Sequence, residues 1–164
     1  MILLMVPAYL ANMAPPFLRY WHGPNPPISR KWLGDHKTYG GFLIGALAGL
    51  LAARLIFGLP GGSDSNSSLY PIAPYWFWFG ISMGLAALVG DSLKSFFKRR
   101  IGIASGAPWI PFDQLDFIVA ALLVLSCWMP LGWLEAVLIM LLSFVGDVLI
   151  NQVSYRLGIK RDPW

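Results

Sequence analysis

Long apolar segments dominate this sequence, and we expect each to cross the hydrocarbon core of a membrane, which is about 30 Å thick. They run approximately over Met1–Tyr20, Gly40–Leu59, Ile72–Ser92, Leu115–Met129 and Leu131–Val153. Only 12% of the 164 residues are charged, which is about half the share in an average soluble domain. We therefore expect a single polytopic membrane domain over residues 1–164, all α-helical, with five transmembrane helices.

Lysine and arginine fall on alternate connections between these segments. The connections 20–39 and 93–114 and the C-terminal tail are basic, whereas the connections 60–71 and 129–132 contain neither residue. Connections rich in Lys and Arg stay on the cytosolic side of a membrane. This asymmetry predicts a multi-pass protein of the cell membrane with its N-terminus outside and its C-terminus in the cytosol.

Prolines and loop composition refine this topology. Pro7, Pro15 and Pro16 should kink the first segment or end it early, because proline removes a helical hydrogen bond. The connection after it is rich in Pro, then basic and aromatic, which is typical of an interfacial segment. We predict a short helix there, around Ser29–Tyr39.

Polar residues gather at the predicted inner ends of the segments. An ionisable side chain at mid-bilayer costs about 2.5–3.5 kcal/mol, so such residues usually face a cavity or a partner. The group comprises Asn12, Asp91, Lys94, Asp113, Asp116, Asp147, Asn151 and Arg156. Nothing comparable gathers at the outer ends, so we expect the functional site to face the cytosol.

The stretch GDSLKSFFKRR places acid and base on one helical face. Asp91, Lys94, Ser95 and Lys98 are spaced by three and four residues, which are neighbours on a helix surface. An inside-positive collar would explain the bases Lys98, Arg99 and Arg100. It would not explain Asp91, because carboxylates contribute little to orientation.

The stretch IPFDQLDF holds two carboxylates one helical turn apart. Asp113 and Asp116 could present oxygen atoms to one point, as a hard divalent cation such as Mg²⁺ requires when it also binds substrate phosphates. Helix capping is the alternative, because acids are favourable in a first turn. Capping accounts for Asp113 more readily than for a second acid that faces the membrane.

Two stretches resemble each other within the chain. Val89–Ile103 and Val145–Ile159 align without gaps and share Gly-Asp near the start and Arg-x-Gly-Ile at the end. Chance similarity between two apolar helices is the alternative. A genuine repeat would bring both Gly-Asp steps to one cleft, with Asp147 and Asn151 at positions i and i+4, and Asn12 completing the wall.

Carboxylates combined with Lys and Arg favour phosphoryl or nucleotidyl transfer, where the protein mainly positions groups and neutralises charge. No GxSxG, HExxH or P-loop motif is present, and His22 and His36 both lie in the first loop. An attacking phosphate needs no strong base, because its second pKa is about 6. A small transporter is a rival interpretation, but it would require polar residues along a path through both leaflets.

The motifs GDSLKSFFKRR, APWIPFDQLDF, NMAPP and LGDHKTYGG resemble those of the archaeal CDP-archaeol synthases over essentially the whole chain. The more distant CDP-diacylglycerol synthases carry a related signature. Its opening is matched here by Ser95, Arg99 and Arg100. Asp113 and Asp116 fit its close, with Gln114 where that signature has Arg. The Pro-Gly-His-Gly-Gly block of those enzymes is replaced by SGAPWIPF, which favours the archaeal branch. The Asp-x-x-Asp-Gly pattern of CDP-alcohol phosphotransferases, another rival, is not matched.

The resemblance implies a reaction in which CTP and the lipid 2,3-bis-O-geranylgeranylglyceryl phosphate give a CDP-lipid and pyrophosphate, with Mg²⁺ as cofactor and no nucleic-acid partner. A CDP-diacylglycerol-type synthase with another lipid phosphate is the alternative. The expected catalytic residues are Asp91, Lys94, Asp113 and Asp116, with Asp91, Asp113 and Asp116 as metal ligands. Residues expected to bind CTP phosphates or line the cleft are Lys98, Arg99, Ser95, Asn12, Lys37, Asp147 and Asn151. Trp109 or Phe112 should stack on cytosine or lie in the headgroup layer.

Overall fold

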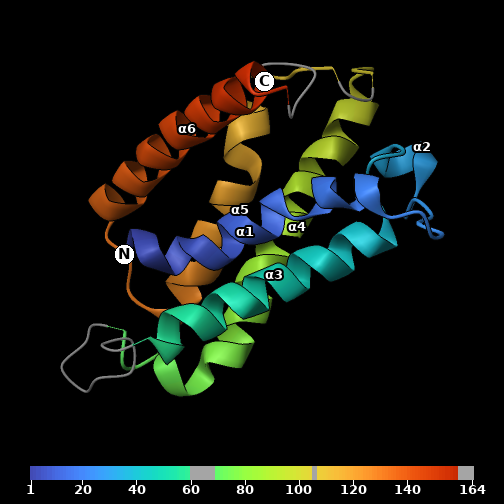
Figure 1. The fold of residues 1–164 in the computed structure, drawn as a ribbon. Helices are drawn as coiled ribbons and strands as arrows, with labels where there is room; N and C mark the ends of the chain where they lie inside the picture. The colour runs from blue at the N-terminus through green and yellow to red at the C-terminus, as the bar shows by residue number, and fades with distance from the viewer. Residues whose placement is uncertain (60–68, 105–106, 159–164) are drawn as a thin grey trace.

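The computed structural model describes residues 1–59, 69–104 and 107–158, and this part of the chain is built from helices (Figure 1). Parts of the connection 60–71, of SGAPWIPF, of the internal repeat (Ile159) and of the basic tail lie outside these residues. The longer α-helices are α1 (Val6–Met13), α3 (Tyr39–Gly58), α4 (Trp76–Arg100), α5 (Phe112–Trp128) and α6 (Trp133–Arg156). The short ones are η1 (Ile2–Met5), η2 (Pro15–Tyr20), α2 (Arg30–Leu33) and η3 (Ala73–Tyr75).

Helices long and apolar enough to cross a membrane occupy most of the described chain. They are Ile2–Tyr20, Tyr39–Gly58, Ala73–Arg100 and Trp133–Arg156. The prediction of an all-helical membrane protein is confirmed. The predicted fourth span corresponds to α5, a helix of 17 residues that is not among these four.

Proline divides the first apolar segment as predicted. Pro7 lies in the first turn of α1, where its missing N–H would have had no helical partner. Pro15 and Pro16 end α1 and begin the 3₁₀ turn η2. The helix expected around Ser29–Tyr39 is confirmed only as a single turn, α2, because Gly34 ends it with a φ of 84°.

The core forms where α3 and α4 approach closely, and α1 packs on both. Glycine allows this approach: a Cβ atom on Gly49 of α3 would lie 3.0 Å from the Cα atom of Gly84 in α4. A second close contact joins α4 to α5, since a Cβ on Gly90 would lie 2.6 Å from the carbonyl oxygen of Asp116. The charged ends of α4 and α5 are thereby held side by side.

Helix α6 stands at the edge of the bundle and packs chiefly on α5 (Figure 1). Only 11% of its most apolar stretch is buried, against 50% for the stretch containing α4. The connection between α5 and α6 is the tight Met129–Gly132 turn that the sequence predicts, and the Gly132 N–H donates to the Glu135 carboxylate at 3.1 Å. One long face of α6 is therefore available to lipid.

Candidate active site

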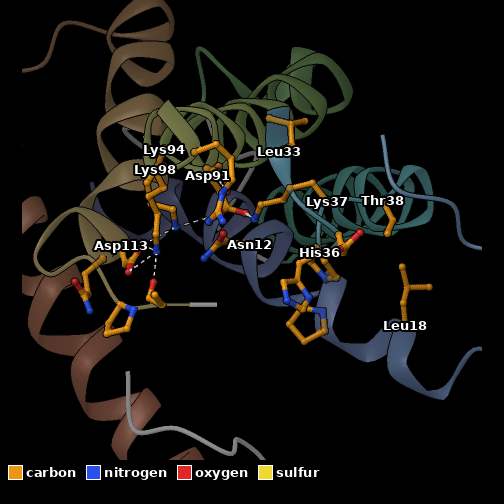
Figure 2. A pocket seen from close by; sticks show the side chains of 18 of the residues that line it. Asn12, Leu18, Leu33, His36, Lys37, Thr38, Asp91, Lys94, Lys98 and Asp113 are labelled. Atoms are coloured by element: carbon orange, nitrogen blue, oxygen red, sulfur yellow. Dashed lines mark hydrogen bonds and ion pairs between the residues drawn. The ribbon is translucent and has the colours of Figure 1, made fainter. Parts of the chain in front are cut away.

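A polar cavity of about 680 Å³ lies where the helix ends that carry the predicted polar residues meet. Figure 2 shows Asn12, Lys37, Asp91, Lys94, Lys98 and Asp113 around it. Ten of the predicted site residues line the cavity: Asn12, Lys37, Asp91, Lys94, Ser95, Lys98, Arg99, Asp113, Asp147 and Asn151. Asp116 does not line it, because its side chain is only 4% exposed and lies behind Lys94.

The Lys94 ammonium group lies between the three carboxylates that we predicted as metal ligands. Its Nζ atom is 3.1 Å from Asp91 Oδ1, 3.2 Å from Asp113 Oδ1 and 2.8 Å from Asp116 Oδ2. Asp91 and Lys94 are one turn apart on α4, and Asp113 and Asp116 are one turn apart on α5. Because Gly90 lets the two helices approach closely, these four side chains meet at one level. The sequence indicated that the carboxylates converge and that Lys94 belongs to the site, but it did not indicate that Lys94 lies between them.

Two further lysines complete the charge balance of this cluster. Lys37, from the loop before α3, pairs with the other oxygen of Asp91. Lys98 lies 3.0 Å from Asp113 Oδ1 and also donates to the carbonyl of Ala107. Three ammonium groups thus face three carboxylates, and each side chain is at most about one-fifth exposed.

These contacts decide between two earlier alternatives. Asp113 is not a helix cap: it accepts the Trp109 N–H from the preceding loop and two lysine contacts, while α5 has no side-chain cap. Lys98 is buried and points into the cluster, so it is no part of a solvent-facing collar. Arg100 fits the collar better, since its guanidinium group stacks outside the cavity on Trp32, 4.8 Å from the ring centroid.

Some polar atoms in the cavity wall have no hydrogen-bond partner within the described residues. They include Nε of Arg99, a predicted phosphate ligand, and Oε1 of Gln114, which is almost fully buried. Gln114 was not among the predicted site residues, although its place between Asp113 and Asp116 was a signal. The Ser95 hydroxyl donates a hydrogen bond to the Asp91 carbonyl oxygen at 2.9 Å.

Helix α6 contributes Asp147 and Asn151 to the opposite wall, as the repeat predicts. The Asn151 amide donates to Asp147 Oδ2 at 2.9 Å. The repeated ends also share a conformation, because Gly102 and Gly158 follow α4 and α6 with φ of 80° and 70°. Within the repeat, Gly146 differs from Gly90: a Cβ atom there would meet nothing within 4 Å.

A second cavity, of about 490 Å³, adjoins the polar one and is lined mainly by apolar side chains of α1, η2 and α6. Asn12, Asp147 and Asn151 line both cavities. The Tyr9 hydroxyl hydrogen-bonds to the Ser143 hydroxyl across the apolar cavity, and the Tyr9 ring packs edge-on against Phe117. Sequence reasoning missed this pair, because its members are separated by most of the chain.

The remaining predicted features are a metal site and two aromatic residues. Within the described ranges, no group of three or more His, Cys, Asp or Glu side chains is arranged to hold a metal ion. The cluster nonetheless offers carboxylate oxygens, the donors that Mg²⁺ prefers, around a position that already holds a cationic group. Trp109 and Phe112 pack on each other with ring centroids 4.4 Å apart, and neither lines the polar cavity.

A charged cavity that adjoins an apolar one in a helical membrane protein suits a substrate with both a charged and an apolar part. A family model described as CarS-like, CDP-archaeol synthase, matches residues 1–164. CDP-archaeol synthase of Methanospirillum hungatei is 36% identical over 98% of this chain and 100% of its own length. That of Methanococcoides burtonii is 34% identical, again over 98% and 100%.

A solved structure agrees with these relatives. It is described as "Structural insight into an intramembrane enzyme for archaeal membrane lipids biosynthesis" and superposes with a TM-score of 0.64 at 32% identity, over 92% of this chain and 91% of that one. The chain belongs to the CDP-archaeol synthase family, a family of CTP-dependent cytidylyltransferases. The resemblance seen in the sequence motifs is therefore confirmed.

Proposed function

We propose that this chain transfers the cytidylyl group of CTP to 2,3-bis-O-geranylgeranylglyceryl phosphate. A phosphate oxygen of the lipid attacks the α-phosphorus of CTP, a P–O bond forms, and the bond to the β-phosphate breaks with release of pyrophosphate. The observation that carries the proposal is the junction of a charged cavity and an apolar cavity at Asn12, Asp147 and Asn151. A nucleotide and a membrane lipid could meet there.

The polar cavity suits the nucleotide. Its volume of about 680 Å³ falls within the usual range for small-molecule sites, about 300–1,000 Å³. Lys37, Lys94 and Lys98 would neutralise the triphosphate and the leaving pyrophosphate. Arg99 would join them, since its buried Nε has no acceptor among the described residues. Fixed cations in a partly buried site stabilise charge that develops on phosphate oxygens.

The carboxylate cluster suits a divalent cation. Asp91, Asp113 and Asp116 would hold Mg²⁺, which when bound would neutralise triphosphate charge and orient the α-phosphate. Their oxygens already surround one cationic group, so the donor set fits. The protein's own part is to position the nucleotide and keep the reacting phosphates beside the lysines.

The apolar cavity suits the lipid. It lies between α1, η2 and α6, and α6 is the least buried of the long helices. Isoprenoid tails could therefore enter sideways from the bilayer while the phosphate reaches the junction. Arg19 lines both cavities and would face the lipid phosphate.

The proposed topology places this site at the cytosolic surface. The N-terminus would lie outside, α5 would be the fifth span, and residues 1–164 would form one membrane domain. The basic connections favour this orientation. It would also give the site access to CTP, which is a cytosolic nucleotide.

An assay of the purified chain tests the proposal. Radiolabelled CTP, Mg²⁺ and the unsaturated ether lipid phosphate should yield a labelled CDP-lipid, and omission of any of them should yield none. Dioleoyl phosphatidic acid in place of the ether lipid separates this activity from that of a CDP-diacylglycerol-type synthase. Folded protein that forms no CDP-lipid with the ether lipid contradicts the proposal.

A further inference from the structure

We infer that Lys94 is an internal counter-ion, which occupies the cation position of the carboxylate cluster until a triphosphate draws it away. The inference rests on the proposed function for the identity of the nucleotide and the metal. It adds an order to their binding: a divalent metal should bind weakly to the substrate-free protein and tightly once the nucleotide is present.

The geometry around Lys94 Nζ is that of a bound cation. Oxygen atoms of Asp91, Asp113 and Asp116 lie within 3.2 Å of it, and they come from two helices. An ammonium group has three N–H donors, so it can serve all three carboxylates at once. The Lys94 side chain is 14% exposed, so little solvent screens these contacts.

The charge balance opposes a metal ion in this state. Lys37, Lys94 and Lys98 already offset the three carboxylates. A divalent cation would have to displace Lys94 and then remain beside the displaced ammonium group, which has lost its partners. Repulsion between cations a few ångströms apart in a partly buried site is large.

A bound triphosphate changes this balance. It offers Lys94 oxygen acceptors in the same cavity, because Lys94 and Lys98 both line it. When Lys94 turns to the phosphates, its three carboxylates are left for the metal, which also contacts the triphosphate. Nucleotide and metal should therefore raise each other's affinity by the same factor.

A purely structural role for Lys94, as a permanent link between α4 and α5, makes the opposite prediction. The link would then stay in place when nucleotide binds, and the cluster would never hold a metal ion. Removing Lys94 would lower stability without creating a metal site. Metal binding to the substrate-free protein separates the two roles, and it does so without any measurement of activity.

The test uses Mn²⁺ and the full-length chain in detergent, with bound Mn²⁺ measured by electron paramagnetic resonance. Lys94→Met should bind Mn²⁺ at least about tenfold more tightly than wild type without nucleotide. Lys31→Met, which removes a lysine outside the cavity, should match wild type. Adding Asp116→Asn to Lys94→Met should abolish the gain. Unchanged binding by Lys94→Met would overturn the inference.

The wild-type chain gives a second measurement that needs no variant to fold. Water-proton relaxation distinguishes Mn²⁺ on the protein from Mn²⁺ on free nucleotide. With α,β-methylene-CTP, which cannot react, Mn²⁺ should bind at least about tenfold more tightly than without it. Equal affinity in the two states would refute the counter-ion role. Absence of CDP-lipid in the activity assay would instead contradict the proposed function and leave these binding results standing.

Discussion

The hydroxyl groups of Tyr9 and Ser143 hydrogen-bond to each other and connect α1 to α6 across the apolar cavity. Ser143 also donates to the Ile139 carbonyl within its own helix, at 2.6 Å. Helix α6 has few other contacts with the bundle. The pair therefore limits how far α6 can move away from α1.

Tyr9→Phe should weaken this connection between α1 and α6, because it removes the hydrogen bond to Ser143. We expect the KM for the lipid phosphate to rise about threefold or more while the KM for CTP stays unchanged, with a loss of stability of about 1 kcal/mol. Steady-state kinetics and thermal unfolding in detergent measure both effects. Ser126→Ala is the control, because among the described residues the Ser126 hydroxyl bonds within its own helix, to the Leu123 carbonyl. A change in the KM for CTP instead would contradict this role.

Asp91→Asn and Asp113→Asn should each lower turnover at least about a hundredfold, because each removes a charge from the cluster that pairs with the lysines and that we propose to hold the metal. Folding should survive, as monitored by circular dichroism and size-exclusion chromatography. Glu135→Gln is the matched control: Glu135 is exposed on α6, lies outside the polar cavity and accepts a hydrogen bond from the Gly132 N–H. Near-normal turnover in both site variants would remove the metal assignment.

Gly90→Ala and Gly146→Ala compare equivalent positions of the internal repeat. At Gly90 the new methyl group would collide with the Asp116 carbonyl and with Ala120, so a loss of about 1–3 kcal/mol is expected. At Gly146 it would meet nothing within 4 Å, so stability should stay the same or rise slightly. Thermal unfolding of the two variants side by side tests the difference. Equal losses would mean that α4 and α5 do not approach as described.

Trp32→Ala should release the first loop from α4. Trp32 stacks on Phe96 with parallel rings 5.5 Å apart, and Arg100 covers both. Stacking and cation–π contacts of this kind contribute about 1–2 kcal/mol. Trypsin should then cut after Arg30 or Lys31 about fivefold faster, as mass spectrometry of timed digests can show. Trp133→Ala, at an exposed position on α6, should leave the rate unchanged.

The sequence was sufficient to predict the helices and most of the site membership. Apolar length gave the spans, proline gave the break in the first segment, and helical spacing brought Asp91, Lys94 and Lys98 to one cavity. These features depend on local geometry, which residue spacing determines directly.

Contacts between distant segments could not be predicted in this way. Spacing along α4 and α5 cannot tell whether Lys94 meets phosphates or lies among three carboxylates, because that depends on how closely the helices pack at Gly90. The position of α6 at the edge of the bundle, and its connection to α1 through Tyr9 and Ser143, likewise depend on tertiary packing.

The exposed face of α6 makes the surrounding membrane a component of the enzyme. With only 11% of its apolar stretch buried by protein, α6 should have lipid chains as its main packing partners, and we expect the same chains to close the outer side of the apolar cavity. The thickness and fluidity of the host bilayer should therefore enter the energetics of substrate entry directly. Detergent micelles would supply a different wall, so a lipid synthase of this design should be characterised in the kind of membrane that its own product helps to build.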